Sequence, residues 1–252
     1  MKARLELEVD RIVGRSATYV QLAQNESLFQ LGTEDAQHAS NEELENVYDR
    51  VLVKGGERPA YNKIRSSAPL NVCPLCFARF VKSVDHYLPK SDFPELSVVY
   101  RNLVPCCSDC NKTKGTEYGE TAETQLFHPY FDDWGDWFFL IANVEINEGV
   151  DVAFSVEQPD GMPDLAFERA TNHLETLGLA ALYSDLSAVE LGDGKAAFQE
   201  HHADGEDVLR RELQRLSASA ARRNRNSWRA AMYRGLSTCH DFLSGGFEFI
   251  PD

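Results

Sequence analysis

The spacing of apolar residues predicts helices in the first part of the chain. Apolar side chains recur three or four positions apart at Leu5, Val9, Ile12 and Val13. Residues 42–53 repeat this pattern, and the pair Gly55-Gly56 that follows is typical of a helix end. We therefore expect residues 1–68 to form an N-terminal helical region.

The middle of the chain contains the shorter apolar runs that are typical of β-strands. Two such runs cover residues 80–88 and 103–106, and a loop that contains proline joins them. Two more runs cover residues 138–146 and 152–156, with a turn at residues 147–149. These runs predict two pairs of strands.

The last third of the chain returns to helical spacing. Residues 166–192 indicate one helix, and residues 207–243 indicate a long helix or a helix pair. We therefore divide the chain into a helical region at 1–68, a central core with its following hairpin at 69–160, and a helical region at 161–252.

Composition narrows the class of protein. The 252 residues are 43% hydrophobic, which suits a folded core, and no run of eighteen apolar residues is present to cross a membrane. Residues 1–13 carry three acidic side chains where a secretory signal would be apolar. We therefore expect a cytoplasmic protein with no membrane partner.

The positive charge of this acidic chain is concentrated in two blocks. The net charge is −15, yet residues 50–114 carry +6 and residues 210–234 carry +7. A protein with this distribution can steer a polyanion to one part of its surface. Charges also segregate along solvated helices without such a role, so charge alone leaves nucleic-acid binding open.

Four of the six cysteines form two C-x-x-C pairs. Cys73 pairs in this way with Cys76, and Cys107 pairs with Cys110. Disulfides are rare in the cytoplasm, and two such pairs can supply the four thiolates of a tetrahedral structural zinc site. A redox pair of the thioredoxin kind needs only one C-x-x-C, so zinc is the better interpretation.

The two remaining cysteines lie outside these pairs. Cys106 is adjacent to Cys107, and the spacing to Cys110 favours Cys107 as the zinc ligand. Cys239 lies far along the chain, and we interpret it as a small core residue.

The sequence around the cysteine pairs contains four pieces in a defined order: CPLC, VDHYLPK, NLVP and CSDCNKTKG. Over roughly residues 70–116, these pieces resemble the ββα-metal motif of the HNH endonucleases, in the subgroup with a four-cysteine zinc site. The resemblance covers under a fifth of the chain. It implies an α+β fold, in which a ββα-metal (HNH) core with a four-cysteine zinc site is wrapped by N- and C-terminal helices and a β-hairpin.

The resemblance also implies roles for individual residues. Asp85 and Asn111 would bind the catalytic metal, and His86 would deprotonate water as the general base. Asn102 would tie the loop and orient the histidine through backbone hydrogen bonds. Because asparagine stands at the third position, where the family often has histidine, the expected catalytic metal is Mg²⁺ or Mn²⁺, beside a structural Zn²⁺.

Elementary chemistry is consistent with these roles. Hydrolysis of a phosphodiester needs water that is activated near neutral pH, and His86 has an ordinary pKa in that range. Asp85 offers hard oxygen atoms to a divalent cation. Adjacent strand residues point to opposite faces, so we expect a twist or bulge near Pro89 to bring Asp85 and His86 together. Ser108 or Asp109 is expected to cap the helix that carries the third motif position.

Basic side chains are the candidates for contacts with DNA phosphates. Those in or near the motif are Lys90, Lys112 and Lys114, and those in the second positive block are Arg222, Arg223, Arg225 and Arg229. We interpret both sets as contacts that do not depend on base sequence. The arginine set has a second interpretation, in which it docks against an acidic partner protein or against acidic segments of this chain.

Two further features have alternative interpretations. His128 could join the metal site or contact phosphate, but we favour a histidine that anchors the chain over the core. The basic residues that precede the first cysteine pair could contact phosphates or lie on a solvated helix; they are Arg58, Lys63 and Arg65.

Two functions are consistent with these residues. The first is a metal-dependent HNH endonuclease, a hydrolase of DNA phosphodiester bonds. Family analogy suggests a bacterial antiviral defence effector that is controlled by a partner ATPase, since this chain has no P-loop of its own. The second is a non-catalytic, zinc-organised DNA- or protein-binding module. The combination of Asp85, His86 and Asn111 favours the enzyme, because binding alone does not require it.

Overall fold

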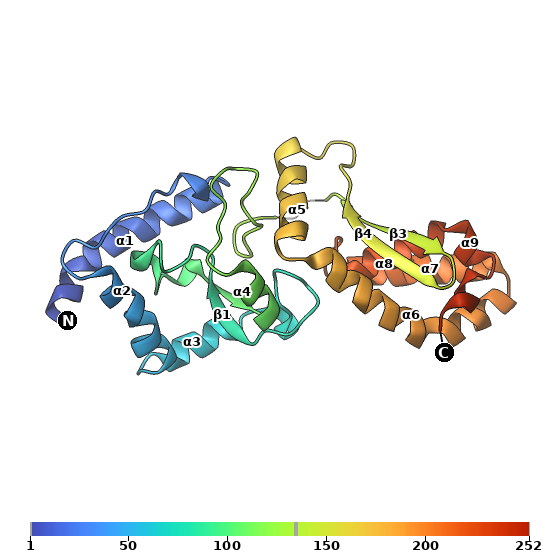
Figure 1. The fold of residues 1–252 in the computed structure, drawn as a ribbon, viewed down its shortest axis with the longest axis horizontal. Helices are drawn as coiled ribbons and strands as arrows, with labels where there is room; N and C mark the ends of the chain where they lie inside the picture. Colours follow the sequence, from blue (N-terminus) through green and yellow to red (C-terminus); the bar gives the residue numbers. More distant parts are fainter. Residues whose placement is uncertain (1, 134–135, 252) are drawn as a thin grey trace. The chain divides into compact units, whose positions relative to one another are not determined.

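A computed structural model describes residues 2–133 and 136–251 of the chain. Contacts between residues divide the chain after Asp133 into an N-terminal unit and a C-terminal unit (Figure 1). Each unit combines helices with a two-stranded antiparallel sheet, which confirms the α+β class. Among these described residues, no helix is long and apolar enough to cross a membrane.

The N-terminal unit places a short hairpin among small helices. Its helices and strands are, in chain order, α1 (Lys2–Gln24), α2 (Asn41–Val47), α3 (Arg58–Arg65), β1 (Ser83–His86), β2 (Leu103–Cys106) and α4 (Ser108–Lys114). A π-helical stretch, Tyr48–Val53, continues α2. The two strands pair antiparallel, with His86 opposite Leu103. The order of β1, β2 and α4 is the strand–strand–helix arrangement that the motif predicts.

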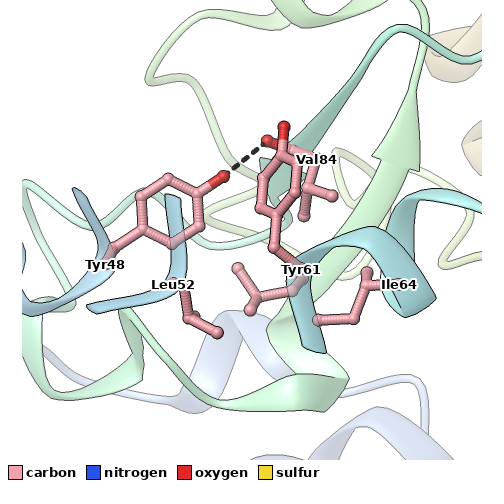
Figure 2. Close-up of a cluster of buried hydrophobic side chains, with 6 residues drawn as sticks. Tyr48, Leu52, Tyr61, Ile64 and Val84 are labelled. Atoms are coloured by element: carbon pink, nitrogen blue, oxygen red, sulfur yellow. Dashed lines mark hydrogen bonds between the residues drawn. The ribbon is translucent and has the colours of Figure 1, made fainter. Parts of the chain in front are cut away.

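One face of this hairpin packs on a hydrophobic cluster. The cluster consists of Tyr48, Leu52, Tyr61, Ile64, Val84 and Leu103 (Figure 2). The hydroxyl of Tyr48 also donates a hydrogen bond to the carbonyl oxygen of Val84 at 3.1 Å. Because each large apolar side chain contributes about 2 kcal/mol when it is buried, the cluster fixes the hairpin to the helices that precede it.

The apolar stripe predicted for the first helix is not its buried face. Val9 and Val13 are more than half exposed, whereas the buried residues of α1 are Glu8, Tyr19 and Ala23. The sequence pattern is misleading here because a charged residue takes an interior position, where it is fully hydrogen-bonded.

Glu8 attaches the loop around His38 to α1. Its Oε1 atom accepts hydrogen bonds from three successive backbone N–H groups, those of Gln37, His38 and Ala39. Arg11 donates to its Oε2 atom at 2.7 Å. Burial raises the pKa of the Glu8 carboxyl, but the hydrogen bonds and the Arg11 charge outweigh it, so the pKa lies at about 2.

The C-terminal unit is a hairpin packed on helices. Its elements are, in chain order, β3 (Leu140–Ile146), β4 (Val150–Val156), α5 (Asp164–Thr176), α6 (Leu179–Ala203), α7 (Glu206–Ala221), α8 (Trp228–Thr238) and α9 (His240–Leu243). Strand β4 packs on α6 and strand β3 packs on α8. Helix α8 lies against strand β3 at Gly235, where a Cβ atom would be 2.4 Å from the carbonyl oxygen of Ala142.

The observed elements differ from the predicted ones in the first helices of the C-terminal unit. The single helix predicted over residues 166–192 is interrupted at Gly178, whose φ of 60° is the left-handed conformation that glycine adopts readily. The hairpin of β3 and β4 belongs to the C-terminal unit, where it packs on α6 and α8. The three-part division of the chain at residues 68 and 160 stays a prediction.

Replacing Glu8 by Gln tests the role of the buried carboxylate. We expect Glu8→Gln to lower the free energy of unfolding of the N-terminal unit by about 2 kcal/mol at pH 7, because hydrogen bonds to a charged acceptor become weaker. The folded-state pKa lies below the ordinary 4.5, so this stabilisation is present above about pH 4.5 and is lost as the pH falls toward 2.

Urea unfolding at pH 7 and pH 3 measures this effect, with Glu6→Gln as the matched control. Glu6 lies on the same helix, but it is exposed and its ion pair with Lys2 is long, at 3.9 Å. Its loss therefore changes the free energy of unfolding by less than about 0.5 kcal/mol. The difference in the free energy of unfolding between wild type and Glu8→Gln should be smaller at pH 3 than at pH 7. A difference that is equal at both pH values would contradict the role given to the carboxylate.

Candidate active site and metal centre

Four cysteine sulfur atoms converge inside the N-terminal unit. They belong to Cys73, Cys76, Cys107 and Cys110, all of which are buried, and the Sγ atoms lie within 4.8 Å of one another. None of the six cysteines forms a disulfide. Zinc–sulfur bonds of about 2.3 Å at tetrahedral angles separate the sulfur atoms by about 3.8 Å. The 4.0 Å between the sulfurs of Cys76 and Cys107 is close to this value, so the donor set fits zinc.

The second cysteine pair also starts the helix of the motif. The Sγ atom of Cys107 accepts a hydrogen bond from the backbone N–H of Cys110 at 3.3 Å, so Cys107 is the N-cap of α4. The sequence predicted Ser108 or Asp109 for this position, because a thiolate is not among the usual capping groups. Cys106 is buried in β2 but is not part of the group of four.

Strand β1 turns Asp85 and His86 toward different neighbours. The carboxylate of Asp85 faces α4, where the Lys114 ammonium lies 3.7 Å from its Oδ2 atom. The ring of His86 instead meets the ring of Tyr48 edge-on, with 4.5 Å between the ring centres. Pairing with β2 is regular through His86, so the paired part of the strand has no bulge, and the expectation that one brings Asp85 and His86 together is wrong there.

The hydrogen bonding of His86 identifies its basic nitrogen. Burial lowers the pKa of the imidazole to about 4, although the Ser97 carbonyl acts in the opposite direction, and the ring is therefore neutral at pH 7. Its Nε2 atom lies 2.8 Å from that carbonyl oxygen, which can only accept, so Nε2 carries the proton. Nδ1 then holds the lone pair, and no residue in the described part of the chain is hydrogen-bonded to it.

Asn102 holds together the two segments on which this tautomer depends. Its Oδ1 atom accepts from the backbone N–H of Leu88 at 2.8 Å. Its Nδ2 atom donates to the carbonyl oxygens of Leu88 and Leu96, at 2.9 and 3.3 Å. Leu88 follows His86 by two residues and Leu96 directly precedes Ser97, so one fully buried amide fixes both the histidine and its acceptor.

Helix α4 brings a second oxygen donor to the Asp85 side of the strand. The Nδ2 atom of Asn111 donates to the hydroxyl of Ser83 at 3.1 Å, which leaves the amide oxygen as its ligand atom. Burial raises the pKa of the Asp85 carboxyl, against the opposing effects of Lys114 and of the His86 N–H. A divalent cation would compensate this buried charge, and carboxylate and amide oxygens suit Mg²⁺ or Mn²⁺, so the residues fit such an ion.

The lysines predicted to contact DNA lie in three different settings. Lys114 is only 2% exposed and donates to the carbonyl oxygen of His86 at 2.8 Å, so it links α4 to β1 in the interior. The prediction that Lys114 contacts DNA is therefore wrong for this structure. Lys90 forms an ion pair with Asp49 at 2.8 Å. Lys112 is exposed on α4, and no acidic residue of the described ranges forms an ion pair with it.

The arginine set of the C-terminal unit is partly neutralised by the chain itself. Arg225 forms an ion pair with Asp136, and Arg229 forms one with Glu190 at 2.7 Å. The two other arginines of the set lie exposed between α7 and α8. The interpretation that this set meets the chain's own acidic segments therefore holds for two of its members.

His128 serves as an anchor and not as a ligand in this structure. The backbone N–H of Tyr130 donates to its Nδ1 atom at 3.1 Å, so its Nε2 atom carries the proton and donates to the hydroxyl of Tyr19 at 2.8 Å. Both ring nitrogens are thus engaged. The residue holds the segment after the motif against α1, which is the interpretation that the sequence favoured.

Comparison with known proteins agrees with this geometry. The model of the HNH endonuclease family matches residues 73–117, from the first cysteine of the cluster to just beyond α4. This segment is an HNH domain. The match, together with the cysteine cluster, supports a nuclease-type function for the chain in general terms.

Two relatives extend the comparison beyond the HNH domain. The chain is 28% identical over 261 residues to protein ea31 of Escherichia phage lambda, an alignment that covers 95% of this chain and 79% of that protein. It is 36% identical over 67 residues to the Septu protein PtuB of Bacillus thuringiensis, which spans 25% of each protein. No solved structure matches the chain.

Two adjacent cysteines provide a direct test of the zinc site. We expect Cys107→Ser to lose zinc and to unfold the HNH domain, because structural zinc contributes about 10–16 kcal/mol in small zinc domains. The matched variant Cys106→Ser alters the neighbouring buried thiol and should keep one zinc per chain, with only a modest fall in Tm. Metal analysis and thermal unfolding measure both effects, and equal zinc contents in the two variants would contradict the ligand set.

Proposed function

We propose that this protein is a metal-dependent endonuclease that hydrolyses DNA phosphodiester bonds at its HNH domain. The observation that carries the proposal is the state of His86: a neutral ring whose proton is fixed on Nε2, so that Nδ1 is free to accept a proton. The anchoring histidine His128 has both ring nitrogens engaged, whereas only one ring nitrogen of His86 is engaged by a described residue. The HNH family match supports DNA as the substrate.

In the proposed reaction, His86 acts as the general base. Its Nδ1 atom takes a proton from the attacking water, and the charge that the ring gains is stabilised by the bond from Nε2 to the Ser97 carbonyl. Asp85 and Asn111 would hold Mg²⁺ or Mn²⁺, and the bound ion would relieve negative charge on the phosphate and on the leaving 3′ oxygen. Asn102 acts as a positioning residue for the base.

A second candidate is a non-catalytic module that binds DNA or protein. One observation favours it: the Lys114 ammonium already lies 3.7 Å from Asp85 and compensates part of the charge that a metal would compensate. In an active enzyme, Lys114 and the metal would share this carboxylate, one on each side. In a binding module, Lys114 would be the permanent partner of Asp85.

We also propose a biological setting. Likeness to a phage protein and partial likeness to the Septu protein PtuB are compatible with a bacterial antiviral defence effector in the cytoplasm. Control by a partner ATPase is part of this proposal. The remaining exposed basic residues, Lys112 above all, are its candidate contacts to DNA phosphates.

A plasmid-nicking assay with zinc-loaded protein and added Mg²⁺ or Mn²⁺ tests the enzyme. We expect His86→Ala to lower the rate by about 10²–10⁴, the usual contribution of a general base. The matched control is His38→Ala, which removes an exposed histidine of the same unit and should nick at the wild-type rate.

Asp85→Asn and Asn111→Ala complete this experiment. Both should raise the concentration of Mn²⁺ that gives half-maximal nicking, because each removes an oxygen ligand or its charge. Equal nicking by wild type and His86→Ala would end the assignment of the base. Wild-type protein that binds DNA but does not nick it with either metal would establish the binding module.

A further inference from the structure

Two tyrosine rings form a stacked pair at the surface of the N-terminal unit. The rings of Tyr100 and Tyr130 are parallel to within 8°, with 5.9 Å between their centres. Tyr130 is held in place by its hydroxyl, which donates to the carbonyl oxygen of Leu103 at 2.8 Å. Tyr100 is 48% exposed, so the outer ring of the pair is open to a flat partner.

An arginine lies across the same rings. The guanidinium carbon of Arg101 is 5.5 Å from the ring centre of Tyr100, 5.9 Å from that of Tyr130 and 5.8 Å from that of Phe131. Arg101 is exposed, and no carboxylate of the described residues forms an ion pair with it. Its charge and its N–H donors are therefore available to an anion from outside the chain.

Further positive charge lies on α3, the helix that ends shortly before Ser67. The side chain of Ser67 lies near the hydroxyl of Tyr130. Ser67 follows α3, whose last turn carries Lys63 and Arg65. Both side chains are exposed, and no acidic residue in the described ranges forms an ion pair with either. A chain with a net charge of −15 thus keeps several unneutralised cations on the segments that lead to the stacked pair, of which Tyr100 is the exposed ring.

The stacked pair lies a short distance from the proposed general base. Tyr100 precedes Leu103 by three residues, and Leu103 is the strand partner of His86. The Cα atoms of Tyr100 and His86 are therefore separated by at most about 16 Å, from about 11 Å of chain and about 5 Å of strand pairing. A single bound strand of several nucleotides can therefore reach both residues.

We propose that Tyr100, Tyr130 and Arg101 form a stacking platform for an unpaired base of a nucleic-acid strand bound by the HNH domain. Tyr100 receives the face of the base, and Arg101 contacts the adjoining phosphate. Aromatic rings with cations accept any base, because every base has a π-face, and a duplex hides those faces. The inference rests on the proposed function for its substrate class. It adds a preference for single-stranded or locally unpaired DNA.

Binding of short oligonucleotides tests the platform apart from catalysis. The full chain carrying His86→Ala, which we expect to cut at least about 10²-fold more slowly, is titrated without added Mg²⁺ or Mn²⁺ in fluorescence anisotropy. The probes are a labelled single strand, the same strand bearing abasic sites, and the matching duplex. We expect the normal single strand to bind about tenfold more tightly than the abasic strand, because stacking is lost while every phosphate remains.

Variants of Tyr100 then assign the difference to the platform. Tyr100→Ala should bind the normal strand about tenfold more weakly and should no longer distinguish it from the abasic strand. Tyr100→Phe keeps the ring and should bind within about twofold of the parent protein. Phe80→Ala, which removes an aromatic ring that is 61% exposed elsewhere in the unit, is the matched control and should bind like the parent.

The outcomes separate this inference from the proposed function. The platform is overturned if Tyr100→Ala still prefers the normal strand over the abasic strand as the parent protein does. It is also overturned if the parent protein binds the two strands equally, even when wild-type protein nicks plasmid. Loss of discrimination in Tyr100→Ala supports the platform even if no nicking is found. Preferred binding of the duplex by the parent protein also overturns the platform, since it would point to phosphate contacts alone.

Discussion

The convergence of four cysteine sulfurs is the constraint on which the HNH domain depends. One pair precedes β1 and the other follows β2 and caps α4, so a single ion bound by all four fixes both ends of the hairpin. Without that link, a two-stranded sheet of four residues per strand is marginally stable in water. The position of α4 against β1, and with it the distance between Asn111 and Asp85, follows from where the second pair is held.

Inside this frame, the site is built from buried polar groups that satisfy one another. His86 is neutral and bound to the Ser97 carbonyl, and Asn102 fixes the backbone on both sides of that bond. Lys114 enters from α4 and contacts both Asp85 and the carbonyl oxygen of His86. Because buried polar groups without partners are costly, each of these contacts limits the positions that its neighbours can adopt.

The sequence predicted what short-range spacing determines, namely the cysteine pairs and the order of β1, β2 and α4, whereas the roles of the motif residues came from the resemblance to the HNH endonucleases and stay a prediction. It could not predict contacts that depend on long-range packing. The acceptor of His86 is a backbone carbonyl, which leaves no signal in the residue type at Ser97. Lys114 looks like any basic residue at a helix end, and its burial is visible only once α4 is placed on β1. The burial of Glu8 could not be predicted for the same reason, because its hydrogen-bond partners lie far along the chain, in the loop around His38.

The most direct test of this account is a crystal structure of the protein with zinc and manganese, with anomalous scattering recorded at both absorption edges. The account predicts one zinc bound by the sulfurs of Cys73, Cys76, Cys107 and Cys110. It also predicts one manganese bound by oxygens of Asp85 and Asn111, with the Nε2 atom of His86 hydrogen-bonded to the Ser97 carbonyl and its Nδ1 atom without a protein partner. Manganese bound elsewhere, or a His86 ring turned so that Nδ1 meets the Ser97 carbonyl, would contradict it.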